Sequence, residues 1–218
     1  MMNTRPGRTP SPPKTPKGQA TRARIVDAAA ALVFEDGVAR TSLDDVGSAA
    51  RVGKSQIYHY FADKSSLIGE VVTRQTVAVL AGQEPYLSQL DSWESWAGWR
   101  DGIIQDQREN RCAGGCPIGS IANEVADDNE DTRLILVDSF DRWEVAFRRG
   151  IARMQAAGLL REDADAPSLA SAILAAVQGG LLLCKTRKNT APLEASLDAA
   201  IGYLRSFELA GTRSATNS

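Results

Sequence analysis

Apolar residues recur every three or four positions along almost the whole chain from Ala20 onward. This spacing places them on one face of an α-helix, which turns once in about 3.6 residues. No run of alternating, β-branched residues bounded by turn signals was found, so no strand is expected. The sequence therefore predicts an all-α fold of about nine helices. The expected spans are about 20–36, 42–50, 54–60, 63–81, 91–109, a short helix from residue 117, 130–156, 167–185 and 192–209.

Residues that favour helix ends mark several of these boundaries. Gly37 suits the position just after the first helix, where a positive φ is common. Thr41 or Ser42 is the expected N-cap of the second helix, and Asp63 is expected to cap the fourth. Residues 51–53, Arg-Val-Gly, are expected to form the tight turn between the second and third helices.

Composition and charge divide the chain. Residues 1–18 hold five of the nine prolines and no acidic residue, which predicts a basic, disordered tail. Residues 19–68 are expected to form a small first domain, 69–210 a larger helical domain, and 211–218 a second disordered tail. Residues 1–68 carry ten Lys and Arg against six acidic residues, whereas the remainder carries 15 against 21. A basic front on an acidic body suggests a polyanionic partner, although chance alone gives so small an imbalance.

Several classes of protein are not expected. The sequence has no run of 18 apolar residues and no apolar leader, so neither a membrane span nor a secretory signal is predicted. Three cysteines do not resemble a disulfide framework and favour the reducing cytoplasm. Phosphate-binding loops, nucleophile elbows and zinc patterns are missing, and His59 is the single histidine. We therefore expect no enzyme activity, no metal and no cofactor.

Residues 42–60 have the pattern of a helix-turn-helix, two short helices joined by a tight turn. Gly53 in the turn is expected to permit a close crossing of the two helices. The expected packing residues are Val46, Ala49, Ala50, Val52 and Ile57. The second helix presents Lys54, Ser55, Gln56, Tyr58, His59 and Tyr60. Such donors, acceptors and aromatic faces suit a reader of the DNA major groove, with Gln56 against adenine and Lys54 against guanine or phosphate.

The run TSLDDVGSAARVGKSQIYHYFADKSSLIGEVV, residues 41–72, resembles the DNA-binding domain of TetR/AcrR-type repressors. The matching positions are Ala50, Val52, Ile57, Tyr58, Tyr60, Phe61, Lys64 and Leu67. Arg51 departs from the usual turn glycine and Gly53 from the usual Ser or Thr. The resemblance implies that Thr41 and Lys64, at helix N-termini, bind phosphates, and Ser42 and Arg51 complete the expected DNA-contacting set.

The segments 115–119, GCPIG, and 123–124, Asn-Glu, resemble a motif of the LmrA/YxaF-like subgroup of these repressors. Residues 178–204 resemble the last two helices of that subgroup, which in the wider family pair with their copies to form a dimer. The expected dimer-interface residues are Ala176, Gly179, Leu183, Leu197, Ile201 and Leu204. A homodimer would place two reading helices about 34–36 Å apart on a palindromic operator in double-stranded DNA.

Trp93, Trp96 and Trp99 lie within an arc of about 120° on one helix. With Cys116 and Trp143 they are the expected lining of an effector pocket, in the region where the family binds its ligands. Packing in the core explains the tryptophans equally well. Few charges fall on these helix faces, which favours an apolar or aromatic small molecule.

Cys112 and Cys116 stand four residues apart in a glycine-rich segment. A metal site would need further ligands, so a buried structural role is favoured over both a metal site and a thiol sensor. The expected function is a repressor that an effector releases from its operator by shifting the helix that begins at Lys64. The alternatives are an activator, a redox- or electrophile-sensing repressor that uses the two cysteines, and a helical adaptor whose helix-turn-helix does not bind DNA.

Overall fold

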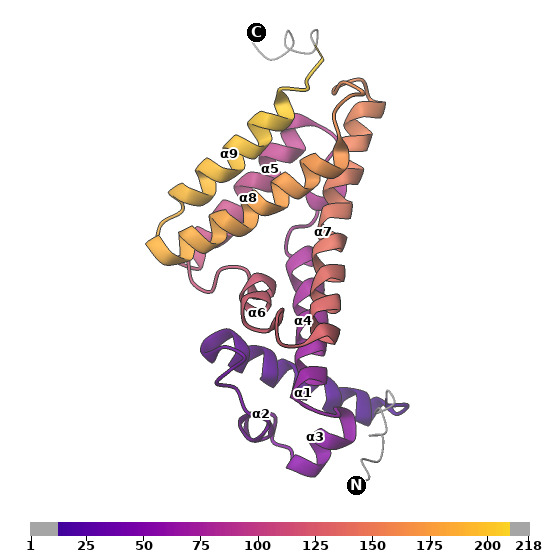
Figure 1. The fold of residues 1–218 in the computed structure, drawn as a ribbon, viewed down its shortest axis with the longest axis vertical. Coiled ribbons are helices and arrows are strands. Elements are labelled where there is room, and N and C mark those ends of the chain that lie inside the picture. Colours follow the sequence, from indigo (N-terminus) through magenta and orange to yellow (C-terminus); the bar gives the residue numbers. More distant parts are fainter. Residues whose placement is uncertain (1–12, 210–218) are drawn as a thin grey trace. The chain divides into compact units, whose positions relative to one another are not determined.

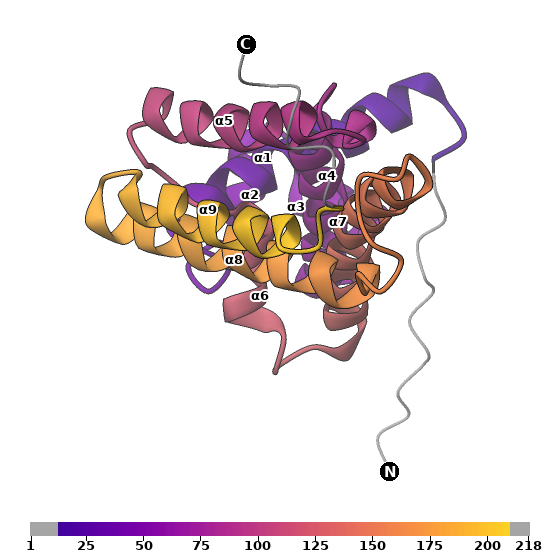
Figure 2. The same cartoon turned by 90° about the horizontal axis from the view of Figure 1, so that it is seen from above.

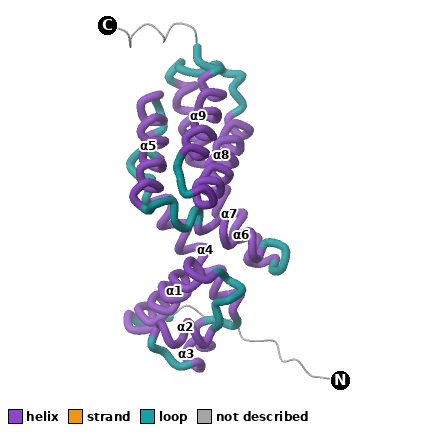
Figure 3. Tube along the Cα trace, turned by 90° about the vertical axis from the view of Figure 1, so that its left-hand side faces the viewer, coloured by secondary structure: helices purple, strands orange, loops and turns teal. Residues whose placement is uncertain are grey.

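The computed structural model describes residues 13–209, and this part of the chain is built from helices and loops (Figure 3). The all-α prediction is confirmed. The α-helices are α1 (Pro16–Asp36), α2 (Leu43–Ala50), α3 (Lys54–Tyr60), α4 (Lys64–Ala81), α5 (Trp93–Glu109), α6 (Pro117–Val125), α7 (Glu130–Ala156), α8 (Ala166–Arg187) and α9 (Ala191–Arg205), with one 3₁₀ turn at Leu87–Gln89.

The first helix begins earlier than the apolar pattern predicted. Pro16 opens α1, four residues before Ala20, because Thr15 accepts a hydrogen bond at Oγ1 from the Gly18 N–H at 3.2 Å. Proline suits the first helical turn, where its missing N–H has no partner in any helix. The predicted disordered tail is therefore wrong for residues 13–18, and residues 1–12 and 210–218 lie outside the described part.

By its contacts the chain forms two compact units that do not follow the predicted boundary at residue 68. One unit contains residues 13–77 and Pro117–Ser139, and the other contains Ala78–Cys116 and residues 140–209. The first unit thus includes α6 and the beginning of α7 as well as α1 to α3. Both α4 and α7 contribute residues to each unit.

The apolar faces of α1 to α4 form the core of the first unit, where Ile25, Ile57 and Phe61 are buried. Arg24 on α1 donates from Nε to the Ala50 carbonyl at 2.9 Å. A cation therefore satisfies an open carbonyl at the end of α2, where the helix dipole favours positive charge. These contacts hold the two short helices 42–60 against α1.

The second unit is organised around α8 and α9, which lie side by side in Figures 1 and 2. Leu193 and Leu197 of α9 are fully buried within the chain. Arg100 on α5 donates to Asp198 on α9 through Nε and Oδ1 at 2.6 Å. A Cβ on Gly180 would lie 3.0 Å from the Leu193 Cα, so the two helices approach closely where glycine leaves room.

The apolar character of α8 modifies one expectation from the sequence. Among the described residues, one helix, α8 (Ala166–Arg187), is long enough and apolar enough to cross a membrane, judged by length and composition alone. Core helices of soluble proteins pass the same test. Here Val177, Leu181 and Cys184 are buried on one side of α8.

Replacing Gly180 with alanine is expected to lower the free energy of unfolding by about 1–3 kcal/mol, the usual cost of overpacking. A Cβ at this position would overlap Ser196 Oγ and lie 2.8 Å from Leu193 Cδ1. Gly102→Ala on α5 is the matched control, because its Cβ would meet only Tyr86 at 4.0 Å. Chemical denaturation measures both variants, and equal stabilities would contradict the close approach of α8 and α9.

Candidate nucleic-acid interface

Ser42 is the N-cap of α2 and forms a capping box with Asp45. Ser42 Oγ accepts from the Asp45 N–H at 3.1 Å, and Asp45 Oδ2 accepts from the Ser42 N–H at 3.1 Å. Hydrogen bonds from the Ser42 hydroxyl and backbone hold the pKa of the Asp45 carboxyl below its ordinary value. Of the two predicted caps, Ser42 is therefore the one used, and its side chain remains exposed.

The turn between α2 and α3 depends on two residues with different roles. Arg51 ends α2 with φ 54° and ψ 49°, the left-handed conformation that the more usual glycine adopts with less strain. The close crossing occurs at Gly47, where a Cβ would lie 3.1 Å from the Val52 carbonyl oxygen and 3.3 Å from Ile57 Cδ1. Gly53 has open space around it, so the predicted role of Gly53 in the crossing is wrong.

The helix α3 buries one side and exposes the other. Ile57 is fully buried beneath it, and Val46 and Ala50 of α2 are buried nearby, whereas Ala49 is exposed and does not pack as predicted. The exposed side chains are Lys54, Ser55, Gln56, Tyr58 and His59, with Tyr60 half-buried. Tyr58 is 48% exposed, which is high for a large aromatic side chain. The face thus presents an amide, a cation, hydroxyls and an imidazole to solvent.

Lys54 on this face pairs with an acid on α2. Its Nζ lies 2.9 Å from Asp44 Oδ1, and the hydrogen bond and charge of Asp44 raise the pKa of Lys54. Both side chains are more than half exposed, so the pair contributes little to stability. Lys54 can therefore exchange this partner for a base edge or phosphate at small cost.

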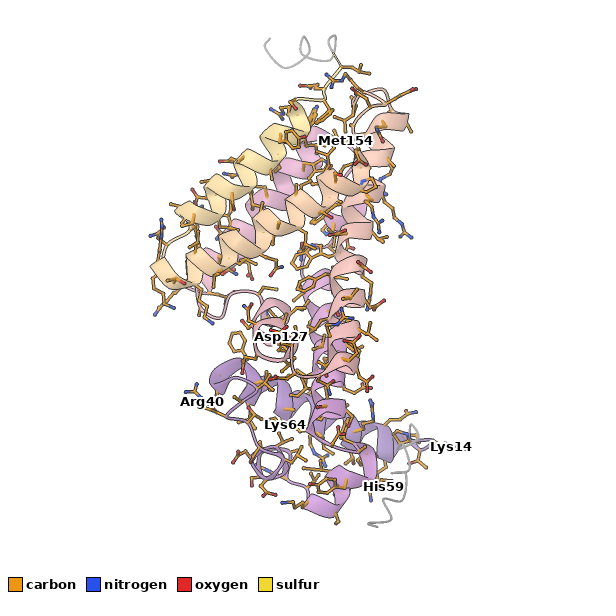
Figure 4. All side chains as sticks on the ribbon, in the orientation of Figure 1. Lys14, Arg40, His59, Lys64, Asp127 and Met154 are labelled. Carbon is orange, nitrogen blue, oxygen red and sulfur yellow. The ribbon has the colours of Figure 1, made fainter. Side chains whose placement is uncertain are left out.

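Two residues predicted to bind phosphate have intramolecular partners. Thr41 is 5% exposed, and its hydroxyl donates to the Gly37 carbonyl at 2.8 Å, so it is not part of the exposed surface. Lys64, labelled in Figure 4 at the start of α4, donates from Nζ to the Val38 carbonyl at 2.6 Å. These partners could not be predicted from the sequence, since backbone carbonyls in a loop carry no residue signature.

The predicted effector residues divide between a packed cluster and its edge. Trp96 and Trp99 are fully buried, with ring centroids 5.9 Å and 5.0 Å from Phe147. The Trp99 indole N–H donates to Gln83 Oε1 at 2.9 Å. Both residues belong to the core, which was the alternative interpretation. Trp93 is half-exposed beneath the Arg205 guanidinium.

Trp143 and Gln107 each have a buried side-chain polar atom without a hydrogen-bond partner among the described residues. Trp143 joins the aromatic cluster through Phe147, with ring centroids 6.5 Å apart. Within the described part of the chain, its indole Nε1 and the Gln107 Oε1 have no hydrogen-bond partner. Such atoms are rare in native interiors and are commonly satisfied by water or a ligand. Gln107 was not among the predicted site residues, because a single glutamine in a helix has no distinctive spacing.

The cysteines give no support to the thiol-sensing alternative. Cys112, Cys116 and Cys184 are all buried. Burial and then a hydrogen bond with the Cys112 thiol raise the pKa of Cys184 to about 12. A thiol in this setting resists conversion to the reactive thiolate. Among the residues described, no group of three or more His, Cys, Asp or Glu is placed to hold a metal ion.

The predicted dimer residues are also divided. Leu197 and Leu204 are fully buried within the chain itself, so their assignment to a surface between subunits is wrong. Ala176 and Ile201 are half-exposed, and Gly179 and Leu183 are exposed. The sequence placed all six residues on α8 and α9. The helical period could not show which face of each helix packs against the other helix.

Comparison with known proteins agrees with this architecture. Residues 25–71 match the family model of bacterial regulatory proteins, tetR family. Residues 94–198 match the model of the transcriptional regulator LmrA/YxaF-like, C-terminal domain. The chain belongs to the TetR family of transcriptional regulators. The earlier resemblance of the helix-turn-helix and of the C-terminal motif is thereby confirmed.

Relatives in the TetR family span nearly the whole chain. An HTH-type transcriptional regulator in the lacX 3′ region of Lactococcus lactis subsp. lactis is 27% identical over 88% of this chain and 96% of its own. The HTH-type transcriptional repressor DhaR of Mycobacterium sp. (strain GP1) is 25% identical over 79% and 86%. The crystal structure of a TetR transcriptional regulator from Chloroflexus aurantiacus is 27% identical, with a TM-score of 0.68 over 90% of this chain and all of that one.

Proposed function

We propose that this TetR-family regulator is a homodimeric repressor that holds a palindromic operator with α3 and leaves it when a small effector binds. The observation that carries the proposal is the exposed face of α3, where Lys54, Gln56 and Tyr58 project from a helix anchored by buried Ile57. Polar and aromatic side chains on a rigid helix suit the major groove. A regulator of this kind acts where the DNA is, and we place it in the cytoplasm by analogy with the bacterial regulatory proteins whose family model it matches.

The proposed dimer rests on an uncovered apolar strip along α8 and α9. Leu182 and Leu183 are exposed on α8, and Tyr203 is exposed on α9. Gly179 and Gly202 have open space where a Cβ would point, so both helices offer small residues for close approach. Exposed large apolar side chains beside small ones favour association of two helix pairs.

Changing Leu183 to glutamate is expected to separate the proposed dimer into monomers and to weaken operator binding. A carboxylate in an apolar interface loses its hydration without gaining a partner. Sedimentation analysis at micromolar concentration measures the change. Leu134→Glu, at another exposed leucine on α7, is the control and should leave the mass unchanged. A dimer that survives Leu183→Glu would argue against this surface.

The effector proposal rests on the second unit. The Trp143 N–H, which lies in the aromatic cluster, and the Gln107 side-chain oxygen are both buried without a partner among the described residues of this unit. An apolar or aromatic molecule with an acceptor or a donor would satisfy either of these groups. We propose that binding of this molecule shifts α4, which contributes residues to both units. The shift would change the spacing between the α3 helices of the two subunits. A coupling of about 1–3 kcal/mol between effector and operator would suffice.

Selection from a random double-stranded DNA library with the purified full chain tests the proposed function. The expected result is a palindrome whose half-sites lie about 10 base pairs apart, occupied by two copies of the chain. Transcription in vitro from a promoter carrying that palindrome should fall when the protein is added. A rise would indicate an activator, and failure to enrich any sequence would refute the proposal in favour of a helical adaptor.

A further inference from the structure

One peptide group in the loop between α1 and α2 is held at both ends by charged side chains. The Val38 carbonyl accepts a hydrogen bond from Lys64 Nζ at 2.6 Å. The Ala39 N–H, in the same peptide group, donates to Glu124 Oε2 at 3.0 Å. The carbonyl and the N–H of a trans peptide point in opposite directions, so a cation holds one end and an anion the other.

The two charged residues come from helices that lie outside the loop. Lys64 is the first residue of α4, and Glu124 lies in the last turn of α6. Both belong to the same compact unit as the loop, and Lys64 and the neighbouring Arg40 are labelled in Figure 4. Hydrogen bonds that involve a charged group are stronger than neutral ones. The peptide group therefore connects three segments that are separated in sequence.

Gly37 makes the approach of Glu124 possible. Its φ is +86°, and a Cβ there would lie 3.0 Å from Glu124 Oε1 and 3.1 Å from Oε2. Any other residue would be strained in this conformation and would also press against the carboxylate. The Gly37 carbonyl in turn accepts from the Thr41 hydroxyl, one residue before the N-cap of α2. The loop thus leads directly from the held peptide group to the start of the helix-turn-helix.

We propose that the Val38–Ala39 peptide group is the joint through which α4 and α6 position the helix-turn-helix, and that Lys64 and Glu124 are positioning residues for DNA reading. Lys64 then acts through the loop and supplies no phosphate contact. This inference rests on the proposed DNA-binding function. A rotation of the peptide group breaks both hydrogen bonds together. The losses of operator affinity on replacing Lys64 and on replacing Glu124 are therefore not additive.

Amide hydrogen exchange tests the joint without any DNA. Glu124→Ala in the full chain should speed exchange of the Ala39 amide by roughly tenfold, the effect expected for loss of a hydrogen bond to a charged group. Glu124→Gln, which keeps an acceptor, should give a smaller change. Asp127→Ala is the matched control, because Asp127 is an exposed carboxylate just beyond α6. An Ala39 amide whose exchange is the same in all these variants would overturn the joint.

Operator affinity tests the positioning role with the palindrome selected above. Lys64→Ala and Glu124→Ala should each weaken binding roughly tenfold, and the double variant should bind within about twofold of the weaker single variant. Lys64→Ala should leave the salt dependence of binding unchanged. Additive losses, or a fall of about 1.8 in the slope of log K against log salt for the two lysines of a dimer, would overturn the proposal and assign Lys64 to phosphate.

DNA binding and the joint at the Val38–Ala39 peptide group are decided by separate measurements. Failure of the unaltered chain to bind any selected DNA would refute the proposed function and with it the role in DNA reading. The exchange of the Ala39 amide decides on the joint in either case. Thermal unfolding of each variant distinguishes a loosened loop from an unfolded chain, and Lys64→Arg, which keeps a charged donor, should recover most of the lost affinity.

Discussion

Replacing Gln56 and Tyr58 together with alanine is expected to abolish sequence-specific operator binding while the fold remains intact. Both side chains are exposed on α3, so neither supports the core. Each contact to a base edge contributes about 1–3 kcal/mol to discrimination, so the loss of two lowers operator affinity by a factor of at least about 30. Fluorescence anisotropy on the selected palindrome measures the dissociation constant, and thermal unfolding should show an unchanged midpoint.

A control variant on α7 and a Lys54 variant on α3 accompany this measurement. Val137→Ala combined with Asp138→Ala removes two exposed side chains from α7 and should leave DNA binding unchanged. Lys54→Ala should weaken binding to all sequences and reduce its salt dependence if Lys54 exchanges Asp44 for a phosphate. Full operator affinity in the Gln56 and Tyr58 double variant would exclude α3 as the reading helix and favour the adaptor interpretation.

Replacing Trp99 with alanine is expected to lower the free energy of unfolding by about 3–5 kcal/mol. The indole is buried between Trp96 and Phe147, with ring centroids 5.7 Å and 5.0 Å away. Its removal also leaves the Gln83 side-chain oxygen without the indole N–H that it accepts from. This loss is a large part of the free energy of unfolding of a typical folded domain, about 5–15 kcal/mol. Chemical denaturation at 25 °C measures it.

Trp93 provides the comparison within the same helix. Its ring is half-exposed and lies 4.8 Å from the Arg205 guanidinium carbon. Trp93→Ala should therefore cost clearly less, because a partly exposed side chain loses less burial and an exposed cation–π contact contributes only about 0.5–1 kcal/mol. If both substitutions cost the same small amount, Trp99 would line an unfilled site and would not be part of the core.

Much of the helical architecture could be predicted because helix formation is signalled locally. The three-and-four spacing of apolar residues located every α-helix to within a few residues, and Asp63 caps α4 as expected by accepting from the Ser66 N–H at 2.8 Å. The exposed face of α3 could be predicted in the same way, since Ile57 is its one large aliphatic side chain and must turn inward. Both signals lie within a window of one or two helical turns.

The tertiary structure alone decided which partner each of these faces meets. The period placed Leu197 and Leu204 on an apolar face, and only the packing of α9 showed that this face turns toward its own chain. The same holds for Lys64 and Glu124, whose backbone partners are 26 and 85 residues away in the sequence. Apolar periodicity is a property of one helix, whereas a hydrogen bond to a distant backbone group depends on where two helices come to lie. The sequence by itself therefore determined the helices and the exposed face of α3, and the packing decided how that face is held.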